Sequence, residues 1–166
     1  MIVDVLKGLD VTAWARAVVL LVILCCAVVD DIRRFRISNK IIMPGVILAC
    51  MIAVVDCVVN GNMNMIIDVC AGGGIGFVAA LAVYIMHGIG AGDVKLFMVC
   101  GMLTGYGYVC GMLVISLIAG VIIGVIEIIA RCGKVVDVKG WNLHVTHFSI
   151  GIFIGNVFVM AERLFM

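Results

Sequence analysis

The sequence predicts an all-α, polytopic membrane protein whose residues 1–166 form a single membrane-embedded domain. Hydrophobic residues make up 66% of the chain and charged residues only 13%, and the mean hydropathy is +1.35. A soluble domain of this size needs a more polar surface. A bilayer core about 30 Å thick requires roughly 20 apolar residues per helix, and such stretches recur along the chain. We therefore expect the helices to lie in membrane lipid.

Six apolar segments are expected to form membrane helices. The fourth is too short to cross a bilayer unless it takes in the Gly-Tyr-Gly-Tyr turn that follows it. Two glycine pairs with a spacing of four, Gly72/Gly76 and Gly120/Gly124, would let helices approach one another closely. The expected segments are about 11–29, 41–59, 65–86, 94–103, 109–130 and 145–160.

Basic residues predict the orientation of these segments, because Lys and Arg collect in short cytoplasmic loops. Most of the eleven Lys and Arg lie in the loops 30–40, 87–95 and 131–144, whereas the loop 60–64 carries no charge. The N-terminus is therefore expected outside the cell and the three basic loops in the cytoplasm. A net charge of +1 without a long basic run gives no reason to expect nucleic acid as a partner.

Two aspartate groups lie where apolar segments meet the cytoplasmic loops. Asp30 and Asp31 close the first segment, and Asp93 opens the fourth within Gly-Ile-Gly-Ala-Gly-Asp-Val-Lys at 88–95. The expected topology brings both groups to one side of the membrane at similar depth. Two carboxylates placed together can hydrolyse a peptide, one taking a proton from water while the other, protonated, polarises the carbonyl.

Each aspartate also has a structural interpretation. Asp93 could cap the start of the fourth helix, where Asp is favoured. Asp31 faces the negative end of its helix dipole, at a cost of about 0.3–1 kcal/mol that nearby arginines could offset. If the two share a site, they cannot easily both ionise. The helix dipoles then favour the proton on Asp31 and an ionised Asp93 beside Lys95.

Two motifs, in this order, resemble those of the type IV prepilin peptidases, a family of membrane aspartate proteases. The family's second motif, Gly-x-Gly-Asp-x-Lys, is complete at 90–95. Its first motif is an Asp at the end of helix one followed, after five residues, by Ile-Pro-Asn. Here Asp31 is followed at that spacing by Ile-Ser-Asn at 37–39, with serine in place of proline. The spacing selects Asp31 over Asp30.

The resemblance implies an aspartic endopeptidase that removes the leader peptide of prepilins or pseudopilins at the cytoplasmic face of the cell membrane, in a type IV pilus or protein secretion system. Asp31 and Asp93 would be the catalytic residues. Asn39 is also expected to cap the second helix. The residues that match the family's supporting positions in the active-site loop and motifs are Gly90, Gly92, Lys95 and Asn39.

We expect neither a metal nor a cofactor. The eight cysteines include no C-x-x-C pair and seven lie inside apolar runs, whereas zinc sites and disulfide frameworks favour polar loops and tighter spacing. We interpret them as small buried hydrophobic side chains, with Cys132 as a candidate free thiol. Longer family members carry a cytoplasmic insertion with paired C-x-x-C motifs linked to N-methylation. This chain lacks that insertion, so no methyltransferase activity is expected.

A second hypothesis is a proton-coupled membrane carrier or channel component that uses intramembrane carboxylates as relays. It would give a role to three carboxylates outside the motifs. Asp56 and Asp68 lie near outer helix ends, where a hydrated, structural role is expected, and Glu127 could pair with Arg131 at i+4. A third hypothesis is a non-catalytic scaffold of a secretion complex, against which the intact Gly-x-Gly-Asp motif argues.

Overall fold

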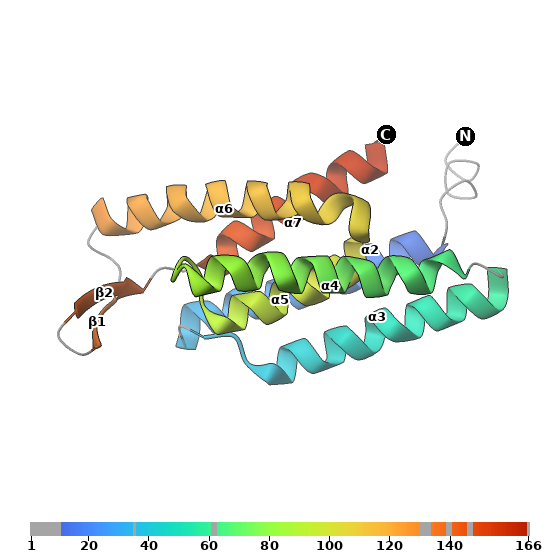
Figure 1. The fold of residues 1–166 in the computed structure, drawn as a ribbon, viewed down its shortest axis with the longest axis horizontal. Coiled ribbons are helices and arrows are strands. Elements are labelled where there is room, and N and C mark those ends of the chain that lie inside the picture. The colour runs from blue at the N-terminus through green and yellow to red at the C-terminus, as the bar shows by residue number, and fades with distance from the viewer. Residues whose placement is uncertain are drawn as a thin grey trace.

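The computed structural model describes residues 11–34, 36–60, 63–129, 134–138, 141–145 and 148–165, and they form six helices and a β-hairpin (Figure 1). Each helix corresponds to one apolar segment expected from the sequence, so the prediction of an all-α fold with six helices is confirmed. The helices are α2 (Val11–Arg34), α3 (Asn39–Asn60), α4 (Asn64–Ile85), α5 (Ala91–Thr104), α6 (Tyr106–Ile129) and α7 (Phe148–Phe165).

A two-stranded hairpin separates α6 from α7. Strand β1 (Lys134–Val138) pairs along its whole length with the antiparallel strand β2 (Trp141–Val145). The prediction of a loop over 131–144 is therefore wrong for these strands. Their valines favour an extended backbone, because β-branched side chains suit a pleated strand. Because β2 extends to Val145, the last helix begins at Phe148 rather than near 145.

Within the described residues, three helices are long and apolar enough to cross a membrane by length and composition. Their outward faces carry large apolar side chains, such as Val58, Ile67 and Val121. Such a surface suits lipid rather than water. The chain is therefore a multi-pass membrane protein. The three candidate spans are Asn39–Val58, Asn64–Ile85 and Tyr106–Glu127, and a shorter apolar helix covers Phe148–Glu162.

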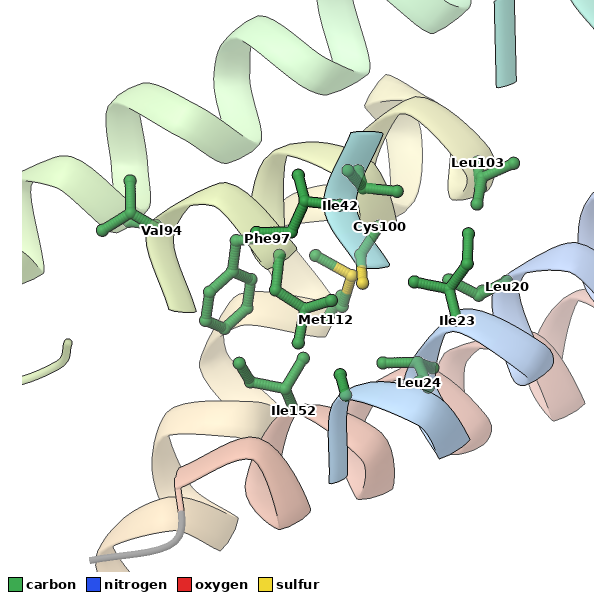
Figure 2. Packing of buried hydrophobic residues seen from close by; sticks show 14 of the residues in the cluster. Leu20, Ile23, Leu24, Ile42, Val94, Phe97, Cys100, Leu103, Met112 and Ile152 are labelled. Atoms are coloured by element: carbon green, nitrogen blue, oxygen red, sulfur yellow. The ribbon is translucent and has the colours of Figure 1, made fainter. Parts of the chain in front are cut away.

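Helix α5 lies at the centre of the bundle, where it packs against each of the other five helices. A helix of 14 residues is about 21 Å long, which is shorter than the bilayer core. Because other helices surround α5, its ends need not reach both lipid surfaces. Figure 2 shows side chains from α2, α3, α6 and α7 around those of α5: Leu20, Ile23, Leu24, Ile42, Val94, Phe97, Cys100, Leu103, Met112 and Ile152.

Glycines allow the closest contacts between helices. A side chain at Gly72 of α4 would collide with the backbone of Gly101 on α5. A Cβ at Gly76 of α4 would come within 2.8 Å of the Phe97 carbonyl oxygen, also on α5. Gly120 of α6 lies against the ring of Phe148 on α7. The expected close approach is therefore confirmed at these three positions, where small residues let helices pack tightly in a membrane.

The cysteines are less buried than expected. Of the seven that the structure describes, only Cys100 is buried, Cys57 is half-buried and the other five lie on the outer surface of the helices. Their interpretation as buried side chains is therefore wrong for most of them. In a membrane bundle this surface meets acyl chains, which a small apolar thiol tolerates well. Cys132 lies outside the described residues.

The helices alternate in direction, so the two aspartate motifs come to the same end of the bundle. The C-terminal end of α2 and the first residues of α3 and α5 lie at the end that also carries the hairpin (Figure 1). We call this the motif end. The opposite end holds the start of α2, the end of α3 and the start of α4 (Figure 1).

Candidate active site

Asp31 lies in the last turn of α2 and is buried in the bundle. Its residue exposure is 8%, and Ser149 at the start of α7, itself 1% exposed, donates a hydrogen bond from Oγ to Asp31 Oδ2 over 2.6 Å. An O–H···O bond of this length to a carboxylate is in the charge-assisted range. Sequence reasoning missed Ser149, because it lies 118 positions away and belongs to no motif.

Asp30 contacts different groups from those that Asp31 contacts. Its Oδ1 lies 3.2 Å from Arg34 Nε, one helical turn further on, and its Oδ2 accepts a hydrogen bond from the backbone N–H of Ser38 over 2.9 Å. Both carboxylate oxygens of Asp30 therefore hold the end of α2 and the turn into α3. Asp31 is the member of the pair that lies inside the bundle.

The turn into α3 shows that the expected capping role of Asn39 is wrong. The backbone N–H of Lys40 donates to Ser38 Oγ over 3.3 Å, and that of Ile41 donates to the Ser38 carbonyl over 3.0 Å. Ser38 therefore occupies the cap position. Asn39 instead accepts a hydrogen bond at Oδ1 from Lys95 Nζ of α5 over 3.0 Å. This bond joins the two sequence motifs directly.

Asp93 is the third residue of α5, and its Oδ2 accepts a hydrogen bond from the backbone N–H of Gly90 over 3.1 Å. An acidic side chain that bonds back to the N-cap nitrogen in this way is one half of a capping box. Gly90 has no side-chain oxygen that could complete the other half. The structure therefore gives Asp93 a capping role, from the third helical position rather than from the N-cap itself.

The proton preference of Asp93 is the reverse of the one expected. Asp93 lies at the loop end of α5, before its apolar part. Burial raises the pKa of Asp93 from 3.8 to about 7, the hydrogen bond from Gly90 lowers it, and the negative charge of Asp31 raises it. The expectation that Asp93 stays ionised is therefore wrong, because desolvation outweighs the helix dipole. Near neutral pH a large fraction of molecules hold a proton on Asp93.

The glycines of the second motif let the start of α5 lie against the first motif. A Cβ at Gly92 would come within 3.2 Å of Ile37 Cβ and 3.3 Å of Ile37 N, and one at Gly90 would come within 3.1 Å of Asp93 Oδ2. Glycine is the residue that permits such an approach of backbone to backbone. The start of α5 therefore packs against residues 37–39 of the first motif.

A second polar cluster lies at the opposite end of the bundle. Arg16 of α2 is 3% exposed, its Nη2 lies 3.3 Å from Asp68 Oδ2 of α4, and it donates to the Met102 carbonyl of α5 over 3.1 Å. Asp68 Oδ1 accepts a hydrogen bond from the backbone N–H of Tyr106, the first residue of α6, over 2.9 Å. This cluster ties four helices together and gives Asp68 the structural role expected for it.

The remaining membrane carboxylates differ in their surroundings. Asp56 is only 4% exposed, so the expectation that it is hydrated is wrong. Glu127 is half-buried near the end of α6, and its expected partner Arg131 lies outside the described residues. The carrier hypothesis uses three carboxylates as proton relays, and one of them, Asp68, is held in an ion pair with Arg16. Among the described residues, no three His, Cys, Asp or Glu side chains gather as a metal site would require.

The fold and the site define a multi-pass helical membrane protein in which carboxylates from two separate motifs come together at one end of the bundle. The family model for the type IV leader peptidases matches residues 18–125, a range that contains both Asp31 and Asp93. The chain belongs to the type IV leader peptidase family and is an aspartic-type prepilin leader peptidase. No curated protein and no solved structure gives a match.

Proposed function

We propose that Asp31 and Asp93 form the catalytic dyad with which this peptidase cleaves the leader peptide of prepilins or pilin-like proteins. The observation that carries the proposal is that the two motifs meet at one end of the bundle, where burial raises the pKa of Asp93 and the nearby charge of Asp31 raises it further. In such a pair one carboxyl holds a proton while the other is ionised. This is the state that acid–base hydrolysis of a peptide requires.

The raised pKa of Asp93 decides the proposed roles. The carboxylate of Asp31 removes a proton from a water molecule, whose oxygen attacks the carbonyl carbon of the scissile bond. The protonated carboxyl of Asp93 donates a hydrogen bond to the carbonyl oxygen and stabilises the negative charge that develops there. When the tetrahedral intermediate collapses, the C–N bond breaks and the proton held by Asp31 passes to the leaving amine. Both carboxyls then regain their starting states.

The contacts between the motifs support this geometry. The hydrogen bond from Lys95 to Asn39 holds the start of α5 against the turn after α2, and Gly92 adds a backbone contact to the same turn. Because each of the two helices carries one carboxylate, these contacts set the relative position of the dyad. The N–H of Gly90 orients Asp93. We assign these four residues to the support of the active site.

The motif end is proposed to face the cytoplasm and the N-terminus the outside, with the six helices embedded in the cell membrane. The exposed basic side chains at this end support the proposal, because short cytoplasmic loops are rich in Lys and Arg. A substrate with a hydrophilic leader and a hydrophobic helix would present their junction to the dyad at this boundary. The exposed basic residues are Arg33, Arg34, Arg36 and Lys40.

Processing of a co-expressed prepilin in membranes tests the dyad. The variants are Asp31→Asn, Asp93→Asn and the matched control Asp30→Asn, because Asn keeps the shape of Asp but cannot exchange the proton. We expect the first two to lower the cleavage rate by about a hundredfold or more. Asp30→Asn should retain most of it, because the carboxylate of Asp30 holds Arg34 and a backbone N–H instead.

This comparison requires that each variant be present in the membrane in equal amount, which an immunoblot checks. Normal processing with either Asp31 or Asp93 replaced would contradict the proposed dyad. A loss in Asp30→Asn as large as that in Asp31→Asn would contradict the choice between the two neighbours.

A further inference from the structure

Ser149 belongs to neither sequence motif and lies beyond the residues that the family model matches, yet its hydroxyl contacts the carboxylate of Asp31. It stands in the first turn of α7, the helix that follows the hairpin. The acid–base steps described above give it no role. A buried polar side chain that bonds a reacting group usually affects its orientation and its charge state.

We propose that Ser149 is a positioning residue for the cleavage reaction: its hydroxyl holds the carboxylate of Asp31 in the orientation in which it takes the proton from water. The inference rests on the proposed dyad and adds a third helix, α7, to the active site. The two aspartates then differ in what orients them: Asp31 accepts a hydrogen bond from a side chain, whereas Asp93 accepts one from a backbone N–H.

The chemistry of the bond suits a positioning role. A serine hydroxyl supplies one hydrogen and does not itself titrate near neutral pH, so it can direct one carboxylate oxygen without exchanging a proton with it. The O···O distance of 2.6 Å lies in the range of strong hydrogen bonds to carboxylates. Both side chains are buried, so water competes little and the bond is stronger than it would be at the surface.

The packing at the start of α7 fixes the place of Ser149. The ring of Phe148 packs on that of Phe97 of α5, with centroids 6.3 Å apart and planes tilted by 47°. A Cβ at Gly151 would lie 2.7 Å from the backbone of α6, so α6 and α7 approach closely here. The hydroxyl of Ser149 is therefore brought to Asp31 by packed helices on both sides.

The charged groups at the motif end define the background against which Ser149 acts. Over 148–155 α7 carries no charged side chain, so this helix contributes a neutral donor alone. The charged side chains at this end of the neighbouring helices are Asp93 and Lys95 on α5, Lys40 on α3 and Glu127 on α6, with Asp30, Arg33 and Arg34 on α2 itself.

The test is the rate of prepilin cleavage by the full-length enzyme as a function of prepilin concentration, for wild type, Ser149→Ala and Ser149→Cys. Ser149→Ala should lower kcat about tenfold and leave KM within about twofold of the wild-type value. This split follows because the lost hydrogen bond orients a group that acts in the chemical step and does not hold the substrate. Ser149→Cys keeps a weaker donor of similar size and should fall between the two.

Ser116→Ala is the matched control. Ser116 lies on α6 against α7, is fully buried, and its Oγ has no hydrogen-bond partner among the described residues. Its replacement should therefore leave kcat and KM at wild-type values. The thermal midpoint of unfolding of each variant, measured in detergent, shows whether any loss of rate comes from loss of the folded protein.

Two results would overturn the inference about Ser149. One is a Ser149→Ala enzyme with the wild-type kcat and KM. The other is a Ser149→Cys enzyme that is as slow as Ser149→Ala while both have equally lowered thermal midpoints, which would indicate a packing defect rather than a lost donor. Failure of the proposed dyad is a separate result, because it would leave cleavage intact in Asp31→Asn.

Discussion

Asp30 and Asp31 are adjacent and chemically identical, and their surroundings separate them. A helix turns by about 100° per residue, so the two side chains leave α2 on different faces. Asp30 meets Arg34 and the turn into α3, whereas Asp31 meets the hydroxyl of Ser149 inside the bundle. At the scale of the residue, the neighbours of a carboxylate thus decide whether it holds a turn or is available for proton transfer.

Asp93→Asn is expected to make the stability of the protein less dependent on pH. The pKa of Asp93 rises from 3.8 to about 7 on folding, so the folded protein retains a proton that the unfolded chain releases. Between these values the wild type loses stability as the pH rises, and the penalty is complete above about 7. The variant carries no charge at this position. Its thermal midpoint should exceed that of the wild type by a few degrees at pH 8 and match it near pH 4.

Asp30→Asn is the control for this measurement, because it removes a carboxylate that is paired with Arg34. A gain in the midpoint of Asp93→Asn that is the same at pH 4 and pH 8 would contradict the raised pKa. This experiment needs no substrate and therefore reports on the folded protein alone.

At the scale of the element, the short helix α5 explains much of the architecture. Its apolar residues point in all directions, as expected for a helix that is buried on every side. Glycines on α4 and α5 bring the two backbones together, and Gly105, with φ +89°, ends α5 in a conformation that glycine adopts freely. The next helix begins at once with Tyr106, whose N–H is capped by Asp68.

Gly72→Val should destabilise the bundle by about 1–3 kcal/mol, because a side chain at Gly72 would overlap the backbone of Gly101 and force α4 and α5 apart. Gly74→Val is the matched control on the same helix, since a Cβ at Gly74 meets nothing within 4 Å. The measurement is the thermal midpoint in detergent, which should fall by about 5 °C for the first variant and stay near wild type for the second. Equal midpoints for the two variants would contradict the observed packing of α4 on α5.

At the scale of the whole molecule, polar groups gather at the two ends of an apolar bundle. The motif end carries the two aspartates, and the opposite end carries the pair of buried Arg16 and half-buried Asp68. Breaking a buried ion pair leaves an uncompensated charge, so this pair is suited to hold the ends of α2, α4 and α6 together. The opposite end thus has a structural role, whereas the motif end carries the proposed dyad.

The orientation of the molecule can be measured with single cysteines in a cysteine-free variant. Arg36 lies at the motif end and Asn64 at the opposite end, and both are exposed. With the motif end in the cytoplasm, a maleimide that cannot cross membranes should label Asn64→Cys in intact cells and Arg36→Cys only after permeabilisation. The reverse pattern would contradict the proposed orientation, and activity of the cysteine-free parent shows that its fold is retained.

Local patterns in the sequence were sufficient for the class of fold and for the family. Each apolar run became one helix, because a stretch of that length and hydropathy has few other stable structures in a membrane. The spacing within the two motifs indicated the family that the comparison confirmed. The motif aspartates came to one end because the helices alternate in direction, a consequence of connecting successive segments by short loops.

Contacts between distant residues were decided by the tertiary structure alone. Ser149 reaches Asp31 across 118 positions, and Asn39 bonds Lys95 instead of capping its own helix. The proton preference of Asp93 also differs from the sequence-based expectation, because burial depends on the elements that pack around it whereas the helix dipole is local. The sequence by itself determined the helices, the motifs and the family. The bundle determined which side chains meet, since distance through space and loss of water exist only once the helices have packed.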